Sequence, residues 1–213
     1  MFLHKIMNLG GCKMKIIVSE SQFRILDEQQ GMDNFTVKIA ETYPDSVYML
    51  EFITNFIRTS GCEKITTGQL KYGAQGVSLV NGVVISEQAF TRSFSTFLYI
   101  LFHEIAHQYQ YKKYGIDKMY ACYTGELPVE DAANWMLQTE KVADDFAVRK
   151  IREMQQLFDD EYDINEPEVK VYDEAPIEHF IELINIFTQE INKKGYQNKE
   201  EISEILFNFV KNN

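Results

Sequence analysis

Cysteine is scarce in this chain, with three copies among 213 residues. Cys12, Cys62 and Cys122 are far apart and form no C-x-x-C pair. This spacing argues against a thiolate zinc site and against a dithiol redox motif. An odd number of dispersed cysteines is typical of free thiols in a reducing compartment, and we expect three of them.

Long apolar runs are also missing. The most apolar stretch, Phe97–Phe102, is far shorter than the roughly 20 residues of a membrane-spanning helix. The N-terminal region has no apolar run long enough for a signal peptide, and Met1, Met7 or Met14 could be the true start. These features predict a cytoplasmic protein with no membrane partner.

Basic residues are too few for a nucleic-acid partner. The chain has 21 Lys and Arg against 32 Asp and Glu, a formal net charge of −11, whereas binding to phosphates needs clustered positive charge. Hydrophobic residues make up 45%, which is ordinary for a globular protein. The length predicts one domain, with a helical extension at most.

The N-terminal region predicts two strands and two helices. Lys15–Val18 is a short apolar run that favours a strand, and Ser19 begins a capping-box pattern at the start of a helix. Phe35–Ala40 alternates and predicts a second strand. A second helix is expected from Asp45, as its N-cap, to about Thr59.

A β-hairpin is predicted next, from two apolar segments separated by a turn. Val77–Val80 and Val83–Ser86 flank Asn81 and Gly82, which supply the positive φ angles of a type I′ turn. A helix is then expected from Ser93 or Ser95, as its cap, to about Tyr114.

The remainder of the chain reads as helical. A long amphipathic pattern covers Val129–Phe158, and two further helices are expected near Ile177–Lys193 and Lys199–Lys211. We therefore predict an α+β domain over residues 1–158, an acidic connector over 159–176 and C-terminal helices over 177–213 that pack on the same domain.

The chemistry resides in residues 103–107, which read His-Glu-Ile-Ala-His and fit H-E-x-x-H on the predicted helix. Residues i and i+4 share one helix face, so His103 and His107 can bind one cation. Glu104, one residue past the first histidine, can act as the base for a water on the metal. The alternative is a set of core polar groups hydrogen-bonded without a metal.

A catalytic zinc ion needs a third protein ligand. Glu140 and Asp144 lie one turn apart on the next long helix, so Glu140 is our candidate ligand. Asp144 would accept the free ring N–H of a ligand histidine. His179 is another candidate ligand, and an exposed Glu and Asp on an acidic helix is the structural alternative.

A donor to the oxyanion is also expected in zinc hydrolysis, usually a tyrosine or histidine. Tyr120, Tyr123, Tyr172 and His179 are available, and spacing does not choose among them. His4 is an N-terminal bystander in this interpretation.

Two segments resemble the ImmA/IrrE-like metallopeptidases, a gluzincin-type group. Ile100–Tyr109 fits the extended zincin pattern, and Glu140–Ala147 fits the E-x-x-A-x-x-F-A element of that family. Gly82–Ser86 resembles the strand that precedes the H-E-x-x-H helix. The resemblance implies a zincin-like domain with a small mixed or antiparallel sheet, in which that strand borders the substrate cleft.

The main hypothesis is a zinc-dependent endopeptidase with one Zn²⁺ ion and an intracellular protein or peptide substrate. A zinc-containing binding or regulatory module without turnover is the alternative. A hydrolase of non-peptide amides is a third possibility, and a free strand edge beside the metal would favour peptides over it.

Overall fold

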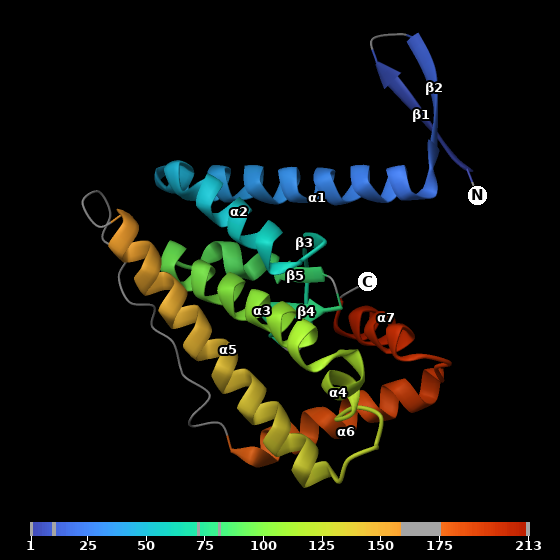
Figure 1. Cartoon of the computed structure of the whole chain (residues 1–213), viewed down its shortest axis with the longest axis vertical. Helices are drawn as coiled ribbons and strands as arrows, with labels where there is room; N and C mark the ends of the chain where they lie inside the picture. Colours follow the sequence, from blue (N-terminus) through green and yellow to red (C-terminus); the bar gives the residue numbers. More distant parts are fainter. Residues whose placement is uncertain (1, 10–11, 72, 81, 159–175, 212–213) are drawn as a thin grey trace.

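The protein is a mixed α+β structure, mostly helical, with a small three-stranded mixed sheet (Figure 1). The computed structural model describes residues 2–9, 12–71, 73–80, 82–158 and 176–211. The predicted α+β class is confirmed. Among the helices within these ranges, none combines the length and the apolar character needed to cross a membrane.

The chain begins with a two-stranded antiparallel hairpin that extends away from the helices (Figure 1). Its strands are β1 (Phe2–Leu9) and β2 (Cys12–Ser19). The predicted strand Lys15–Val18 lies within β2, and β1 was not predicted. Helix α1 (Glu20–Thr42) begins directly after Ser19.

The predicted strand at Phe35–Ala40 is wrong, because these residues belong to α1. Met32, Phe35 and Ile39 are buried, whereas Val37 is 55% exposed. The apolar residues that face the core are therefore spaced by three and four, as in a helix. The alternation of Phe35, Val37 and Ile39 arises by coincidence, since one of the three faces solvent.

The second predicted helix is divided into two elements. A 3-10 helix, η1 (Pro44–Met49), precedes α2 (Leu50–Ser60). Asp45 is therefore inside a 3-10 turn and is not an N-cap, because the chain turns at Pro44 before the α-helix can begin. Gly61 ends α2 with a φ of 86°, a left-handed conformation that favours glycine at helix ends.

The three-stranded sheet consists of β3 (Lys64–Gly68), β4 (Gly76–Leu79) and β5 (Gly82–Ser86), in the order β3-β5-β4. Strand β5 pairs in parallel with β3 and antiparallel with β4. The expectation that Gly82–Ser86 borders a substrate cleft is therefore wrong, since both of its edges are already paired. The edge strands are β3 and β4, and β4 is the one that contacts α3.

The predicted hairpin of β4 and β5 is confirmed, with a register shifted by one residue. Leu79 pairs with Gly82, so Val80 and Asn81 lie between the strands in place of Asn81 and Gly82. The side-chain amide of Gln108 donates to the carbonyls of both Leu79 and Gly82, at 2.7 and 3.1 Å. This tertiary contact fixes the register at the hairpin end.

Helix α3 (Phe94–Tyr114) lies at the centre of the molecule. It follows the 3-10 helix η2 (Glu87–Thr91), and the Ser93 hydroxyl caps it by accepting the Thr96 N–H. Residues Phe97–Phe102 of α3 are hydrophobic and buried on every side, as expected of a central helix. Its predicted end at Tyr114 is confirmed.

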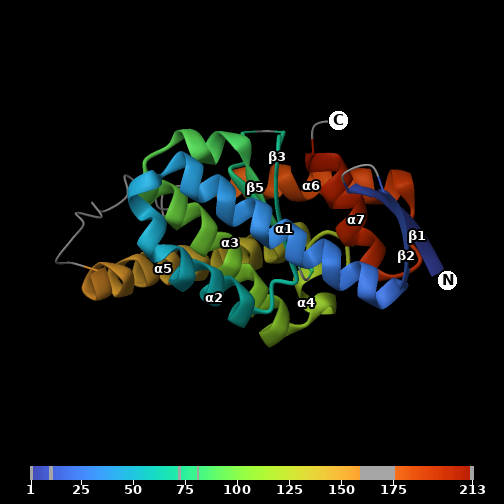
Figure 2. The ribbon, with the colours of Figure 1, turned by 90° about the horizontal axis from the view of Figure 1, so that it is seen from above.

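Helix α5 (Val129–Phe158) has the predicted bounds and packs along α3. In Figure 1, α1 and α2 lie on one side of α3 and the sheet, and α5 lies on the other. Figure 2 shows α1 crossing over α3 when the molecule is viewed from above. The main core lies between these layers, and it joins α1, α2, β3, β5, α3 and α5.

The C-terminal helices α6 (Ile177–Lys194) and α7 (Lys199–Val210) match the predicted ones. Helix α6 packs on α5, and α7 packs on the short helix α4 (Ile116–Tyr120). A backbone N–H of Lys71 donates to the carbonyl of Val210 at 2.7 Å. The predicted acidic connector lies outside the described residues, except for Pro176 at its end.

Candidate metal centre

Three predicted ligands converge between α3 and α5. His103 and His107 project from one face of α3, and Glu140 faces them from α5. The Nε2 atom of His103 lies 3.1 Å from Glu140 Oε2 and 3.2 Å from His107 Nε2. The Nε2 atom of His107 lies 3.6 Å from Glu140 Oε1. This buried group could hold a metal ion.

The three separations agree with the coordination geometry of a small cation. A tetrahedral ion bound at about 2.0–2.1 Å requires donor atoms to lie about 3.3 Å from one another. The two Nε2 atoms lie 3.2 Å apart, and each lies near a different oxygen of Glu140, His103 at 3.1 Å from Oε2 and His107 at 3.6 Å from Oε1. These separations are compatible with one ion held by the three side chains.

The other ring nitrogen of His103 is held by Asp144, as predicted. His103 Nδ1 lies 2.8 Å from Asp144 Oδ1, and Asp144 is 2% exposed. The hydroxyl of Tyr99, one turn before His103 on α3, also donates to Oδ1 of Asp144. Two donors on one buried carboxylate fix its orientation. Tyr99 was not predicted, although its i−4 spacing from His103 was visible in the sequence.

His107 has a comparable partner that the sequence analysis did not identify. Its Nδ1 lies 2.9 Å from Oε1 of Gln110, three residues later on α3. The amide nitrogen of Gln110 donates to the backbone carbonyl of Thr139 on α5, at 2.8 Å. Both histidines therefore direct Nδ1 to an acceptor and Nε2 toward Glu140.

The Nε2 atoms of both histidines and the carboxylate oxygens of Glu140 direct their lone pairs toward the same position. With Nδ1–H donating to Asp144 or Gln110, the Nε2 atoms of His103 and His107 are acceptors that face the Glu140 carboxylate. Buried acceptors that face one another need a proton or a cation between them. A metal ion would supply that positive charge, as would a proton on one of the rings.

The ionisation of these groups follows the same electrostatics. Burial lowers the pKa of His103, but hydrogen bonds to Asp144 and Glu140 raise it well above 6.5. Burial likewise disfavours charge on His107, yet the Glu140 carboxylate raises its pKa above 6.5. Burial also opposes ionisation of Glu140, but the His107 and His103 rings hold its pKa far below 4.5. The centre is built to hold positive charge beside a carboxylate.

Glu104 lies on the sheet side of α3 and is 8% exposed. Its side chain packs against Gly76 of β4, and the backbone N–H of Ser78 donates to its carboxylate. Burial raises the pKa of Glu104 above 4.5, although the nearby charges of His103 and His107 oppose this shift. A carboxyl group whose pKa is raised by burial binds a proton more readily, as a general base must.

The outer edge of β4 faces α3 and is not free at Ser78. Besides the N–H that Glu104 accepts, the Ser78 carbonyl receives a hydrogen bond from the hydroxyl of Tyr111, at 3.4 Å. The free strand edge that would favour a peptide is therefore occupied at this residue by two side chains of α3.

The other predicted site residues lie at different places. Tyr120 is buried, and its hydroxyl lies 3.3 Å from that of Tyr111. Tyr123 is partly buried, and its pKa is raised well above 10 by burial, with a contribution from the negative charge of Glu140. His179 is exposed on α6 and is not among the metal-binding group. Tyr172 lies outside the described residues.

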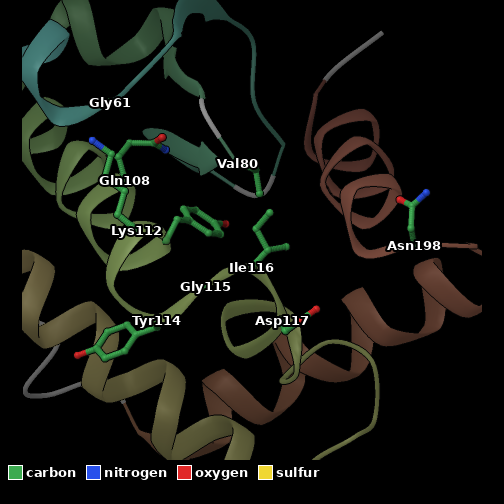
Figure 3. A pocket seen from close by; sticks show the side chains of 10 residues that line it. Gly61, Val80, Gln108, Lys112, Tyr114, Gly115, Ile116, Asp117 and Asn198 are labelled. Atoms are coloured by element: carbon green, nitrogen blue, oxygen red, sulfur yellow. The ribbon is translucent and has the colours of Figure 1, made fainter.

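A pocket of about 790 Å³ lies beside the C-terminal half of α3. In Figure 3, Val80 from the hairpin and Ile116 from α4 point toward one another, with Gln108 and Lys112 of α3 beside them. The pocket includes none of the three metal ligands. Gln108 is the first residue of α3 that lines the pocket, and it lies one helical turn after Glu104 on the same face of the helix.

Comparisons with known proteins give no match for this chain among family models, curated proteins or solved structures. The resemblance to ImmA/IrrE-like metallopeptidases therefore stays a prediction. The geometry of the centre establishes a buried His-His-Glu group that could bind a metal ion.

Proposed function

We propose that the chain is a zinc-dependent endopeptidase of gluzincin type with a zincin-like fold. The observation that carries the proposal is the convergence of His103 Nε2, His107 Nε2 and the two carboxylate oxygens of Glu140 at 3.1 to 3.6 Å, beside a further acidic group. Glu104 is that group, and it adjoins the ligands on α3 without belonging to their set.

Zinc is the metal that this donor set favours. Two imidazoles and one carboxylate are ligands typical of catalytic zinc, which keeps a further position for water or substrate. When bound, zinc would lower the pKa of a water toward about 7 and polarise the scissile carbonyl. The second carboxylate, Asp144, orients a ligand without binding the ion, as in other zinc centres.

Glu104 performs the proton transfers in this proposal. Its carboxylate takes the proton of the attacking water and delivers it to the leaving amine. Burial favours its protonated form, which is the form that must return the proton. Tyr123 is our candidate for the oxyanion donor. The negative charge of Glu140 contributes to its raised pKa, so the Tyr123 hydroxyl lies within electrostatic range of the centre and keeps its proton at neutral pH.

A polypeptide is the proposed substrate. Strand β4 is an edge strand beside Glu104, and an extended peptide could pair with it after Glu104 and Tyr111 release Ser78. The pocket beside α3 could receive a substrate side chain, since it begins one turn from Glu104. The substrate protein is expected in the cytoplasm.

The test compares Glu104→Gln with Glu140→Ala. Glu104→Gln should retain one zinc ion per chain and lose cleavage of a peptide-library substrate by about 10²–10⁴-fold, because the amide cannot accept the proton. Glu140→Ala should lose the zinc itself. Both are measured by elemental analysis of metal content and by mass spectrometry of cleavage products.

The outcomes separate the enzyme from its alternative. Zinc in the wild type together with cleavage that Glu104→Gln does not reduce would contradict the proposed role of Glu104. Zinc without cleavage of any substrate would favour a zinc-containing binding or regulatory module. Unchanged zinc content in Glu140→Ala would remove Glu140 from the ligand set.

A further inference from the structure

Gln110 makes two contacts that connect the metal ligands of both helices. Its side chain is buried, with 4% of the residue exposed. Oε1 lies 2.9 Å from Nδ1 of His107, and Nε2 lies 2.8 Å from the carbonyl oxygen of Thr139. Thr139 immediately precedes Glu140 on α5. One amide group therefore joins the second histidine to the backbone beside the third ligand.

The chemistry of these contacts leaves one orientation of the amide. The Thr139 carbonyl can only accept a hydrogen bond, so the amide nitrogen of Gln110 must face it. The amide oxygen then faces His107, and because it can only accept, Nδ1 of His107 must carry the proton. The Nε2 atom of His107 is left with its lone pair toward Glu140 and His103.

Gln108 provides an internal comparison. It is a buried glutamine on the same helix, 3% exposed, and it also hydrogen-bonds to backbone carbonyls. Its hydrogen bonds go to Ser78, Leu79 and Gly82 of the hairpin, and none of these residues is a metal ligand. The two glutamines are similarly buried on the same helix, but Gln108 connects α3 to the sheet, whereas Gln110 connects α3 to α5.

We infer that Gln110 is a positioning residue of the metal centre. It holds His107 in the tautomer that presents Nε2 to the metal, and it ties that ring to α5 next to Glu140. Asp144 does the same for His103 from α5. The inference rests on the proposed zinc site, but it concerns metal binding and does not require peptidase activity.

The experiment measures zinc affinity by competition with a chromophoric chelator in wild type, Gln110→Met, Gln110→Glu and Gln108→Met. Long-range ¹H–¹⁵N correlation spectra of the zinc-loaded proteins report the tautomer of each histidine ring. Gln110→Met keeps the length of the side chain and loses both hydrogen bonds. Its affinity should fall roughly 10- to 100-fold, and the protected Nδ1–H signal of His107 should disappear.

The conservative variant and the control make the result specific. Gln110→Glu retains an acceptor for Nδ1 of His107 but loses the N–H donor to the Thr139 carbonyl, so it should keep the same tautomer and recover part of the affinity. Gln108→Met should lower thermal stability but leave zinc affinity and the His107 signal unchanged. If Gln110→Met does not fold, Gln110→Glu decides: the retained Nδ1–H signal supports the inference, and its loss overturns it.

Two further results would overturn the inference without affecting the proposed function: wild-type affinity and tautomer in Gln110→Met, or an equal loss of affinity in Gln108→Met. The second would show that any buried glutamine of α3 supports the site through packing. A wild-type protein that binds no zinc would instead overturn the proposed function. The chelator competition tests this with the wild-type protein before any variant is compared.

Discussion

Gly76 lies directly against the carboxylate of Glu104. A Cβ atom at position 76 would lie 2.6 Å from Oε1 of Glu104 and 2.5 Å from its Cγ, closer than non-bonded atoms approach. The absence of a side chain on this strand residue is therefore what allows Glu104 to occupy its position between α3 and β4. The N–H of Ser78, two residues later, then reaches the same carboxylate.

Gly76→Ala should consequently displace Glu104 while leaving the three metal ligands in place. We expect cleavage to fall roughly 100-fold, because a catalytic group moved by about 1 Å loses that much. Zinc content should be unchanged. The measurement is the initial rate of peptide cleavage together with elemental analysis of the purified variant.

Gly68→Ala is the matched control for this change. Gly68 lies in β3 of the same sheet, and an added Cβ would meet Val84 Cγ1 at 3.7 Å, an ordinary contact distance. This variant should keep wild-type activity. Equal losses in both glycine variants would mean that the sheet as a whole, and not the Glu104 contact, determines the rate.

Asp144→Asn should weaken zinc binding by roughly 10- to 100-fold, since the neutral amide orients and polarises His103 less well than a carboxylate. Isothermal titration with zinc measures the effect. Tyr99→Phe removes the second donor to Asp144 without touching a ligand and should lower affinity by a smaller factor. A larger loss of zinc affinity in Tyr99→Phe than in Asp144→Asn would contradict the assignment in which Asp144 contacts His103 directly and Tyr99 acts through Asp144.

Zinc should stabilise the protein more as the pH rises. In the metal-free fold the pKa of His103 is raised well above 6.5, so protonated His103 contributes stability that is complete below the unfolded value of about 6.5. That stability is lost as the pH rises through the raised pKa. Zinc needs the deprotonated Nε2 and becomes more competitive over the same interval.

The difference in Tm between zinc-loaded and chelator-treated protein should therefore widen as the pH rises above about 6.5 and through the raised pKa of His103. Differential scanning calorimetry in both conditions measures it. Glu140→Ala serves as the control and should show a small difference at every pH. A zinc-dependent shift that is constant across this interval would contradict the assigned coupling between His103 and the metal.

The thiols of Cys62 and Cys122 should react very slowly in the folded protein. Both are buried, and burial raises the pKa of each thiol to about 12. At pH 8 only about one molecule in ten thousand would carry the reactive thiolate at either position. Alkylation with iodoacetamide, followed by peptide mass spectrometry, should label both residues promptly in urea and hardly at all in buffer.

The local elements of the site were predictable because their signals are short-range. The i, i+4 spacing of His103 and His107 places both rings on one helix face, and Ser93 and Gly115 mark the ends of that helix. The pair Glu140 and Asp144 follows from the same spacing on a helix whose bounds were also predicted. These features depend only on neighbours within a few residues.

Tertiary contacts decided what local spacing could not. Gln110 reaches Thr139 only because α3 and α5 pack together, and a lone glutamine has no pattern in the sequence. The β3 strand pairs with β5 and makes it a central strand, which reverses the expected position of the cleft edge. Likewise, Phe35 and Ile39 face a core that favours a helix over the alternating pattern.

The sequence by itself therefore determined which groups can bind a metal, since helical periodicity alone brings His103 and His107 together. The tertiary structure decided how those groups are held, from Asp144 and Gln110 behind the ligands to Gly76 against Glu104. The physical reason is range: helix periodicity acts over one turn, whereas the tautomer of a ring and the position of a base depend on side chains from other elements.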